Sequence, residues 1–235
     1  MALPIVNELP KYEVTIPSTG KKTRFRPYLV KEEKALMMAF ETGDQQTGLD
    51  AVIDTIVSCV DEPIDRNRLT TFDVEYLLLK IRSKSVGESI NLNVKCKECE
   101  TPNEHNIIID DINVSNPKID KIIKLTEDIS IEMRYPSLNY VSSISTEDLE
   151  KTESMFKVIC NCIDAILTTE ERISTKDETE EDIMKFLESL TSEQFRKISD
   201  FIKGIPKLSH TVEFKCIKCE KDNSLLVEGI QSFFI

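Results

Sequence analysis

The sequence lacks the motifs on which many enzymes depend. Among its 235 residues there are only six glycines, so the tight glycine-containing loops of many catalytic sites are scarce. There is no glycine-rich phosphate loop, no GxSxG nucleophile motif and no HExxH metalloprotease motif. Acidic side chains are abundant, but the sequence gives no nucleophile an evident catalytic partner. The sequence therefore predicts that this chain is not an enzyme.

Long apolar runs and positive charge are scarce as well. No stretch approaches the roughly 18 to 20 uninterrupted apolar residues of a membrane helix, and the first residues lack the pattern of a secretory signal. We therefore expect no membrane partner and a cytosolic location where the protein is made. The 30 Lys and Arg residues are outnumbered by 42 Asp and Glu residues, which gives a formal net charge of −12. Because an acidic chain repels phosphate backbones, nucleic acid is not an expected partner.

Cysteine, in contrast, is present in a repeated pattern. Seven cysteines are an odd number, and cytosolic thiols stay reduced, so clustered pairs indicate a metal site more than disulfides. The segment VKCKECE at residues 94–100 is repeated as FKCIKCE at residues 214–220. In both, an alternation of apolar and polar residues typical of a half-buried strand leads into the CxxC, and a second apolar run follows it. Both CxxC pairs are therefore predicted to lie at the tips of β-hairpins.

The remaining patterns predict an α+β fold. Alternating residues predict a hairpin at residues 12–26 and a strand pair at residues 122–133. Apolar residues at helical spacing predict helices, one of which follows a capping box at residues 191–194. The predicted helices cover residues 29–43, 49–60, 72–81, 149–167, 183–190 and 195–202. The acidic segment 170–182 is interpreted as a solvated loop that leads into a helix.

These patterns divide the chain into three parts. We expect an N-terminal α+β domain with the first CxxC hairpin at residues 1–140. A helical insertion is expected at residues 141–206. The second CxxC hairpin, at residues 207–235, is expected to pack back on the first, so that the two knuckles form a split zinc-ribbon-like pair.

A CxxC turn directs two sulfurs at one ion and supplies half of a tetrahedral site. The economical solution is one structural Zn²⁺ held by Cys96, Cys99, Cys216 and Cys219, because four protein sulfurs leave no open position for a catalytic water. The lysines that can offset the negative charge of such a centre are Lys95, Lys97, Lys215 and Lys218. The alternatives are buried reduced thiols or redox-active CxxC pairs. A thioredoxin-like pair is expected at the start of a helix, whereas these cysteines end strands.

Other potential ligands fit a metal site less well. Cys160 and Cys162 form a CxC inside a predicted helix, and Cys59 belongs to an apolar helix, so all three are interpreted as core thiols. His105 and His210 each lie near a knuckle, where either can replace a cysteine ligand. A surface position or a place beside the ligands is favoured for both, and neither is assigned as a ligand.

Four segments of the N-terminal half are specific when taken together: PSTG at residues 17–20, RPYLVKEEK at 26–34, FDVEYL at 72–77 and KIRSKSVGE at 80–88. With these segments, the N-terminal half resembles the baseplate hub subunit family of T-even-type contractile-tailed bacteriophages. A looser match continues with YPS at 135–137 and the C-terminal PKLSH and CIKC segments. The resemblance implies a structural or assembly protein of the tail baseplate hub, made in the host bacterial cytoplasm, whose partners are other hub proteins. It implies no catalytic residues, and the zinc prediction depends on the residues of this chain alone.

Two kinds of function therefore remain in view. The leading one is a structural or chaperone-like hub protein that binds other phage proteins and uses a zinc site to hold its two halves in register. Within the matched segments, Arg26, Arg82 and Lys84 are candidates for partner contact or for intramolecular pairing. The alternatives are a zinc-ribbon nucleic-acid-binding regulator, which the acidic charge opposes, and a thiol oxidoreductase, which needs a reactive low-pKa cysteine.

Overall fold

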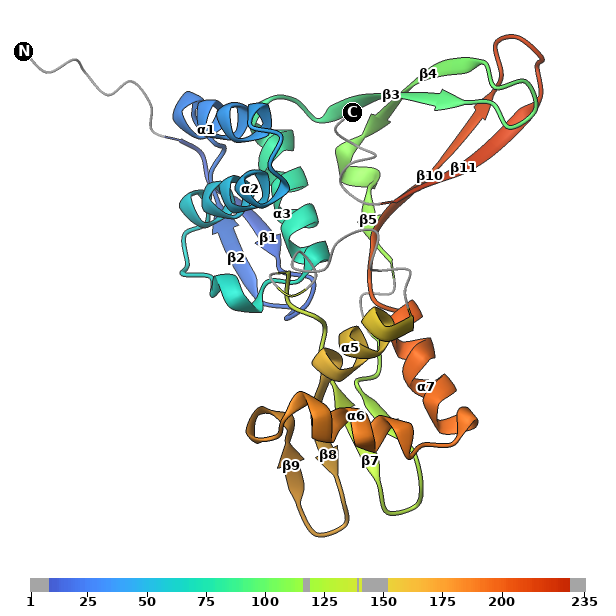
Figure 1. Ribbon diagram of the computed structural model, residues 1–235. Helices are drawn as coiled ribbons and strands as arrows, with labels where there is room; N and C mark the ends of the chain where they lie inside the picture. Colours follow the sequence, from blue (N-terminus) through green and yellow to red (C-terminus); the bar gives the residue numbers. More distant parts are fainter. Residues whose placement is uncertain (1–8, 116–118, 139, 141–151, 229–235) are drawn as a thin grey trace, which may run out of the picture. The chain divides into compact units, whose positions relative to one another are not determined.

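The structure, a computed structural model, describes residues 9–115, 119–138, 140 and 152–228 (Figure 1). The chain falls into two compact units. The first unit combines Met1–Ser115 with Lys207–Ile235, and the second unit comprises Asn116–Pro206. Within the described ranges, the helices are too short or too polar to cross a membrane.

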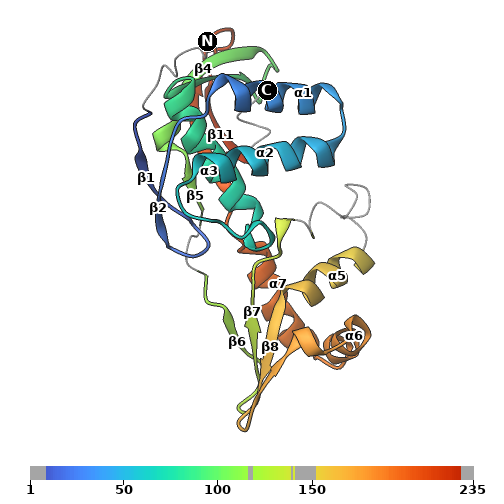
Figure 2. The same cartoon turned by 90° about the vertical axis from the view of Figure 1, so that its left-hand side faces the viewer.

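The N-terminal part of the first unit is a β-hairpin followed by three helices, as the sequence predicted. Its elements are β1 (Tyr12–Thr15), β2 (Lys22–Phe25), α1 (Val30–Glu41), α2 (Gln45–Cys59), a 3-10 turn (Arg66–Arg68) and α3 (Thr71–Ser85). Gly43, with a φ of 69°, follows the end of α1 in the left-handed conformation that glycine adopts without strain. Figure 2 shows α1 and α2 side by side, and the two helices are in contact.

Helix α3 connects this part to the remainder of the first unit. Thr70 caps its N-terminus in a reciprocal pair with Asp73, which is fully buried. One side of α3 contacts α2, and Leu79 on α3 belongs to the apolar core beneath the two CxxC hairpins. The helix therefore ties the N-terminal helices to the hairpins that carry the cysteines.

Each CxxC lies at the tip of a two-stranded antiparallel ribbon, as predicted (Figure 1). The first ribbon is β3 (Ser89–Lys95) with β4 (Pro102–Ile108), and a 3-10 turn (Ile109–Asp111) follows it. The second ribbon is β10 (Leu208–Lys215) with β11 (Asp222–Glu228), and β5 (Asn113–Val114) pairs with the start of β10. The registers close with Lys95 opposite Pro102 and Lys215 opposite Asp222, so the two tips are built alike.

The two ribbons share one apolar core. Alternate residues of β3 are buried, which is the pattern that the sequence alternation predicted. The buried members of the shared core are Leu79, Ile90, Leu92, Val94, Ile107, Ile109, Ile112, Leu208, Val212 and Val227. Residues more than a hundred positions apart therefore pack together beneath the tips, which brings the two CxxC pairs to one place.

The second unit is a four-stranded antiparallel sheet with helices. Its elements are β6 (Ile122–Lys124), β7 (Ser130–Met133), α5 (Thr152–Cys162), β8 (Ile163–Leu167), β9 (Arg172–Ser174), a 3-10 turn (Thr175–Asp177), α6 (Glu180–Glu188) and α7 (Ser192–Lys203). The strand order is β6-β7-β8-β9. The predicted capping box at the start of α7 is confirmed, with Thr191 and Gln194 bonded reciprocally. Apolar side chains from the sheet and the helices form a separate core around Ile131, Ile163 and Ile198.

Two sequence-based predictions for the second unit were wrong. The helix predicted at residues 149–167 ends at Cys162, and Ile163–Leu167 forms β8 instead; Leu149 lies outside the described residues. In β8, Ile163 and Ala165 alternate into the core while the strand pairs with β7 and β9, and short apolar runs match both periods. The predicted loop at residues 170–182 contains β9 and the 3-10 turn before α6 begins.

The boundaries of the compact units also differ from the expected division at residue 140. Strand β7 pairs with both β6 and β8 in one sheet, so the insertion begins after Ser115 and the first unit resumes at Lys207. The insertion is consequently a mixed sheet-and-helix unit rather than a purely helical one. The α+β class, with two knuckles whose cysteines are clustered, is confirmed.

Candidate metal centre

The two CxxC turns, here called the first knuckle (residues 96–99) and the second knuckle (residues 216–219), have the same backbone geometry. The N–H of Glu100 donates to the carbonyl of Cys96 at 2.9 Å, and the N–H of Glu220 donates to the carbonyl of Cys216 at 3.0 Å. Glu100 and Glu220 have φ values of 56° and 55°, a left-handed conformation that costs a residue with a side chain free energy. The repeated sequence therefore encodes a repeated and strained turn.

The four sulfurs of the knuckles converge. The Sγ atoms of Cys96 and Cys219 are 3.6 Å apart, as are those of Cys99 and Cys216, and all four lie within 4.8 Å of one another. Each close pair joins one knuckle to the other, across 123 and 117 residues of sequence respectively. The prediction that the two CxxC pairs meet is confirmed, and they meet within one chain.

The spacing of the sulfurs distinguishes between disulfides and metal coordination. A disulfide requires sulfurs about 2.05 Å apart, and all four cysteines are free. A tetrahedral ion with metal–sulfur bonds of about 2.3 Å places its ligands roughly 3.8 Å apart. The observed 3.6 Å between the close pairs therefore fits four thiolates around a single cation. Such a cation has no open coordination position for catalysis.

The acidities of the thiols also favour coordination of a cation. The backbone N–H of Cys219 lowers the pKa of the Cys216 thiol to about 6, although burial opposes this shift. Burial likewise opposes ionisation of Cys96, but knuckle amides outweigh it and lower the pKa of that thiol. The N–H of Lys221 favours a thiolate at Cys219, yet burial and the three neighbouring sulfurs raise its pKa to about 12. Hydrogen bonds to the sulfurs thus favour ionisation of the first thiols, whereas burial and the neighbouring sulfurs oppose ionisation of the last one. A divalent cation among the sulfurs removes this opposition.

The donors to the sulfurs are amides rather than lysine ammonium groups. The N–H of Lys218 donates to Cys216 Sγ at 3.4 Å, while Lys97 Nζ donates to the Ser224 carbonyl at 2.6 Å. The side-chain amides of Asn103 and Asn223 also donate to cysteine sulfurs. Both asparagines are buried, and the sequence analysis missed them. The sequence repeat could have identified them, because each asparagine lies seven positions after the first cysteine of its knuckle.

The remaining cysteines and the histidines lie outside the sulfur cluster. Cys59, Cys160 and Cys162 are buried in apolar cores, as predicted. Burial raises the pKa of Cys160 to about 11 and that of Cys162 to about 12, so neither is a ready thiolate. His210 Nδ1 lies 3.3 Å from the carbonyl oxygen of Asp111, and His105 pairs with Leu92 across the first ribbon. Among the described residues, the side chains that could together hold a metal ion come from the two knuckles alone.

The candidate contact residue Arg26 is engaged within the chain. Its guanidinium donates to Glu32 Oε1 at 2.8 Å and to the carbonyl of Ser58 at 3.1 Å, and only 20% of its side chain is exposed. Glu32 also accepts the N–H of Leu29 at the start of α1. Burial acts to raise the pKa of Glu32, but Arg26 and the Leu29 N–H outweigh it and hold that pKa below its ordinary value. Arg26 therefore links the end of α2 to the start of α1.

The other two candidates lie on α3. Lys84 forms an ion pair with Glu88 and lies 5.5 Å from the centre of the Tyr12 ring. Arg82 is half-buried and lies near Tyr28. Burial and Glu33 raise the pKa of Tyr28, and the positive charge of Arg82 opposes that shift. Contact of these residues with another protein stays a prediction.

Replacement of Arg26 tests whether its role is intramolecular. R26A is expected to lose about 2 kcal/mol of unfolding free energy at neutral pH, because the buried carboxylate of Glu32 then keeps only the exposed Lys31, at 3.3 Å, as a cationic partner. Since the pKa of Glu32 is lowered in the folded protein, its stabilisation exists above the unfolded pKa and is lost as the pH falls through the folded pKa. The difference between R26A and wild type should therefore shrink in acid, as measured by urea unfolding at several pH values.

The matched control for R26A is R24A. Arg24 lies 3.6 Å from Asp61, and 62% of its side chain is exposed, so its loss is expected to have little effect. If R26A and R24A are equally stable while R26A alone loses partner binding, the intramolecular role of Arg26 is wrong.

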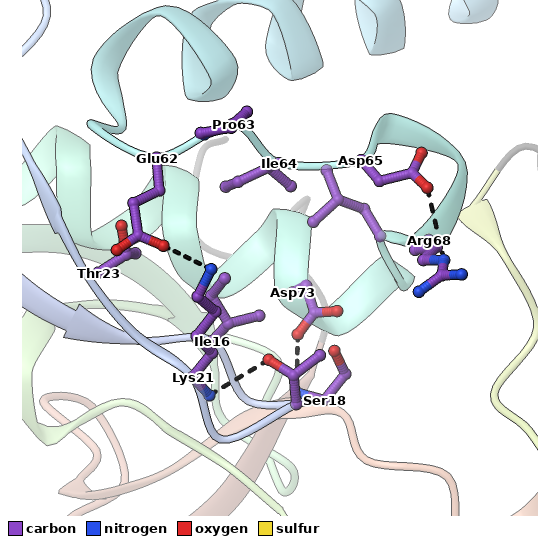
Figure 3. Close-up of a pocket in the computed structure, with 12 residues that line it drawn as sticks. Ile16, Ser18, Lys21, Thr23, Glu62, Pro63, Ile64, Asp65, Arg68 and Asp73 are labelled. Carbon is purple, nitrogen blue, oxygen red and sulfur yellow. Dashed lines mark hydrogen bonds and ion pairs between the residues drawn. The ribbon is translucent and has the colours of Figure 1, made fainter.

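The structure also contains a small pocket of about 140 Å³ beside the turn between β1 and β2 (Figure 3). Four of its five charged lining residues are paired with one another: Lys21 Nζ lies 2.5 Å from Glu62, and Arg68 lies 3.4 Å from Asp65. Figure 3 also shows Asp73 accepting the N–H of Ser18, at 2.9 Å. The charged groups thus stabilise the loops around the pocket.

Comparisons with known proteins identify the family. Searches among curated proteins and among solved structures gave no significant match. A family model described as "T4 bacteriophage base plate protein" matches residues 9–235, almost the entire chain. This agrees with the baseplate resemblance found in the sequence, without specifying the hub. The family consists of structural phage proteins, which agrees with the absence of enzyme motifs from the sequence. The chain therefore belongs to the T4 bacteriophage base plate protein family.

Proposed function

We propose that this chain is a structural subunit of the phage baseplate hub in which one Zn²⁺, bound by Cys96, Cys99, Cys216 and Cys219, clasps two ribbons together. The observation that carries the proposal is the convergence of four free thiols within 4.8 Å from two separate hairpins. The clasp holds the first unit in one conformation, so that its contact surface is preorganised for other hub proteins. The protein acts by geometry and binding rather than by catalysis.

The choice of zinc is supported by the ligand set. Four thiolates at the tips of β-ribbons are typical of structural zinc sites, which have tetrahedral geometry and no open position. Four thiolates also bind a single iron ion, and an iron-loaded chain absorbs visible light, whereas a zinc-loaded chain is colourless. The sulfur cluster is partly shielded, since Cys96 and Cys216 are 1% and 2% exposed. This shielding favours a permanent structural ion over an exchangeable one.

The hub assignment is supported by the segments that carry the resemblance. The segments at residues 26–34 and 80–88 contain Arg26, Lys84 and Glu88, whose ion pairs shape α1 and the end of α3. Helix α1 in addition exposes four large apolar side chains, Val30, Met37, Met38 and Phe40, at 57% or more. Exposed apolar side chains gathered on one element are typical of protein-binding surfaces. The acidic net charge and Glu98, Glu100 and Glu220 around the knuckles disfavour a nucleic-acid-binding role.

The proposal predicts both the metal content and the location of the protein. Elemental analysis of the purified chain should find one zinc per chain and no stoichiometric iron. Mass spectrometry of purified virions should detect the protein in the particle, and controlled disassembly should release it together with hub proteins. Presence in infected cells but absence from virions would make it an assembly factor. Release with peripheral baseplate proteins would contradict the hub assignment.

A further inference from the structure

We infer that Asn103 and Asn223 are positioning residues of the four-thiol centre, each holding the knuckle of the opposite ribbon. This inference rests on the proposed metal site and adds two residues that are not ligands. Both asparagines are at least nine-tenths buried, with exposures of 3% and 7%. Asn103 is the second residue of the return strand of the first ribbon, and Asn223 holds the equivalent position in the second.

The hydrogen bonds of the two asparagines are reciprocal. Asn223 Oδ1 accepts the N–H of Lys97 in the first knuckle at 3.0 Å, and Asn103 Oδ1 accepts the N–H of Ile217 in the second knuckle at 2.8 Å. Asn223 Nδ2 donates to Cys96 Sγ at 3.5 Å, and Asn103 Nδ2 donates to Cys216 Sγ at 3.9 Å. Each side chain therefore bonds both the backbone and a sulfur of the knuckle that it faces.

The orientation of each amide follows from its partners. Asn103 Nδ2 also donates to the carbonyl of Thr101 at 2.7 Å, and Asn223 Nδ2 donates to the carbonyl of Lys221 at 2.9 Å. A carbonyl can accept but not donate, and a backbone N–H can donate but not accept. The oxygen of each side chain must therefore face the opposite knuckle N–H, which leaves its NH₂ group beside the sulfur. A flipped amide would create two repulsive contacts at once.

These contacts suit a buried, negatively charged centre. An N–H directed at a thiolate stabilises its charge without adding a full charge that must itself be desolvated. The same amide fixes the turn from which that sulfur projects, so the sulfurs are held near their binding positions before the ion arrives. A carboxylate at either position would lack the donor and would place a negative charge against the thiolate. Asparagine supplies the required combination of acceptor, donor and neutrality.

The experiment compares N103D and N223D with N106D. Asn106 lies on the same strand as Asn103, but its amide bonds to Asn91 on the exposed face of the ribbon, at 2.6 Å. Zinc affinity is measured on the full-length protein by competition with a chromophoric chelator. N103D and N223D are expected to bind zinc about 10- to 100-fold more weakly than wild type, and N106D is expected to match wild type. Circular dichroism verifies that each variant keeps its helix content; if an aspartate variant does not, N103S or N223S replaces it.

A second readout separates positioning from packing. In the cobalt-substituted protein, loss of an N–H donor makes the thiolate more electron-rich, so the sulfur-to-cobalt charge-transfer band should move to lower energy in the Asn103 and Asn223 variants. Residues that only pack the tips would leave the band where it is in wild type. Variants that match N106D in affinity and band position, with a wild type that binds zinc, overturn this inference alone. A wild-type chain that binds neither zinc nor cobalt overturns the proposed metal site and this inference with it.

Discussion

Stripping the metal with a strong chelator is expected to lower the midpoint of thermal unfolding of the first unit by on the order of 10 °C. Without a cation, four sulfurs within 4.8 Å must take up protons or repel one another, so the tips of the two ribbons lose the attraction that the ion supplies. The apolar core beneath the tips remains, which is why the loss is partial rather than complete. Thermal scans of the reduced protein, with and without chelator, measure the effect.

The C96S/C216S variant removes one ligand from each knuckle and should unfold at the lower temperature whether or not chelator is present. C160A is the matched control, because Cys160 is equally buried but lies in the core of the second unit. It should lose some stability to the cavity that it creates and yet keep the full response to chelator. Identical melting curves of the wild type with and without chelator would refute the clasp.

Replacement of Asp73 by alanine is also expected to have a large effect and to lower the free energy of unfolding by about 3 kcal/mol. Asp73 is fully buried, and its carboxylate accepts three hydrogen bonds: from the Thr70 hydroxyl at 2.7 Å, the Thr70 N–H at 3.1 Å and the Ser18 N–H at 2.9 Å. Its loss removes the carboxylate half of the capping box of α3, although the Thr70 hydroxyl remains, and deprives the part-buried Ser18 N–H in the β1–β2 turn of this acceptor. Hydrogen exchange followed by mass spectrometry should show faster exchange in both α3 and the turn.

D182A provides the control for Asp73. Asp182 forms the same pair with the capping residue Thr179 at the start of α6, at 2.6 Å, but on an exposed surface, where its further partner is the exposed Lys185 of the same helix, at 3.2 Å. D182A should therefore affect only the first turn of α6, and by much less. If D73A were no more destabilising than D182A, the connection that Asp73 makes between hairpin and helix would contribute nothing to stability.

The sequence was informative where the local pattern and the final environment agree. The alternation before Cys96 and Cys216 predicted both ribbons, because each ribbon buries one face on a shared core. The repetition of the CxxC predicted one common site, because one CxxC supplies only two of the four ligands of a tetrahedral ion. The helices of the first unit were also predicted, since their apolar stripes and the glycine stop at Gly43 are local features.

The sequence was less informative where pairing partners decide the structure. Ile163, Ile166 and Leu167 fit helical spacing, but β7 and β9 flank this segment and make it the inner strand β8. Asn103 and Asn223 looked like ordinary polar residues of a return strand, because their partners belong to the other ribbon. The sequence also left open whether Arg26 pairs within the chain or contacts a partner, because only the fold brings Glu32 and Ser58 beside it.

The interrupted first unit has a consequence for biosynthesis. Cys96 leaves the ribosome 123 residues ahead of Cys219, a delay on the order of ten seconds at ordinary rates of bacterial translation. The second unit is continuous in sequence and can fold during that interval, while the first knuckle holds only two of the four sulfurs of the proposed metal site. If the site binds zinc as proposed, the nascent chain is then most exposed to oxidation and to binding of another ion, and the emergence of the last hairpin ends that period.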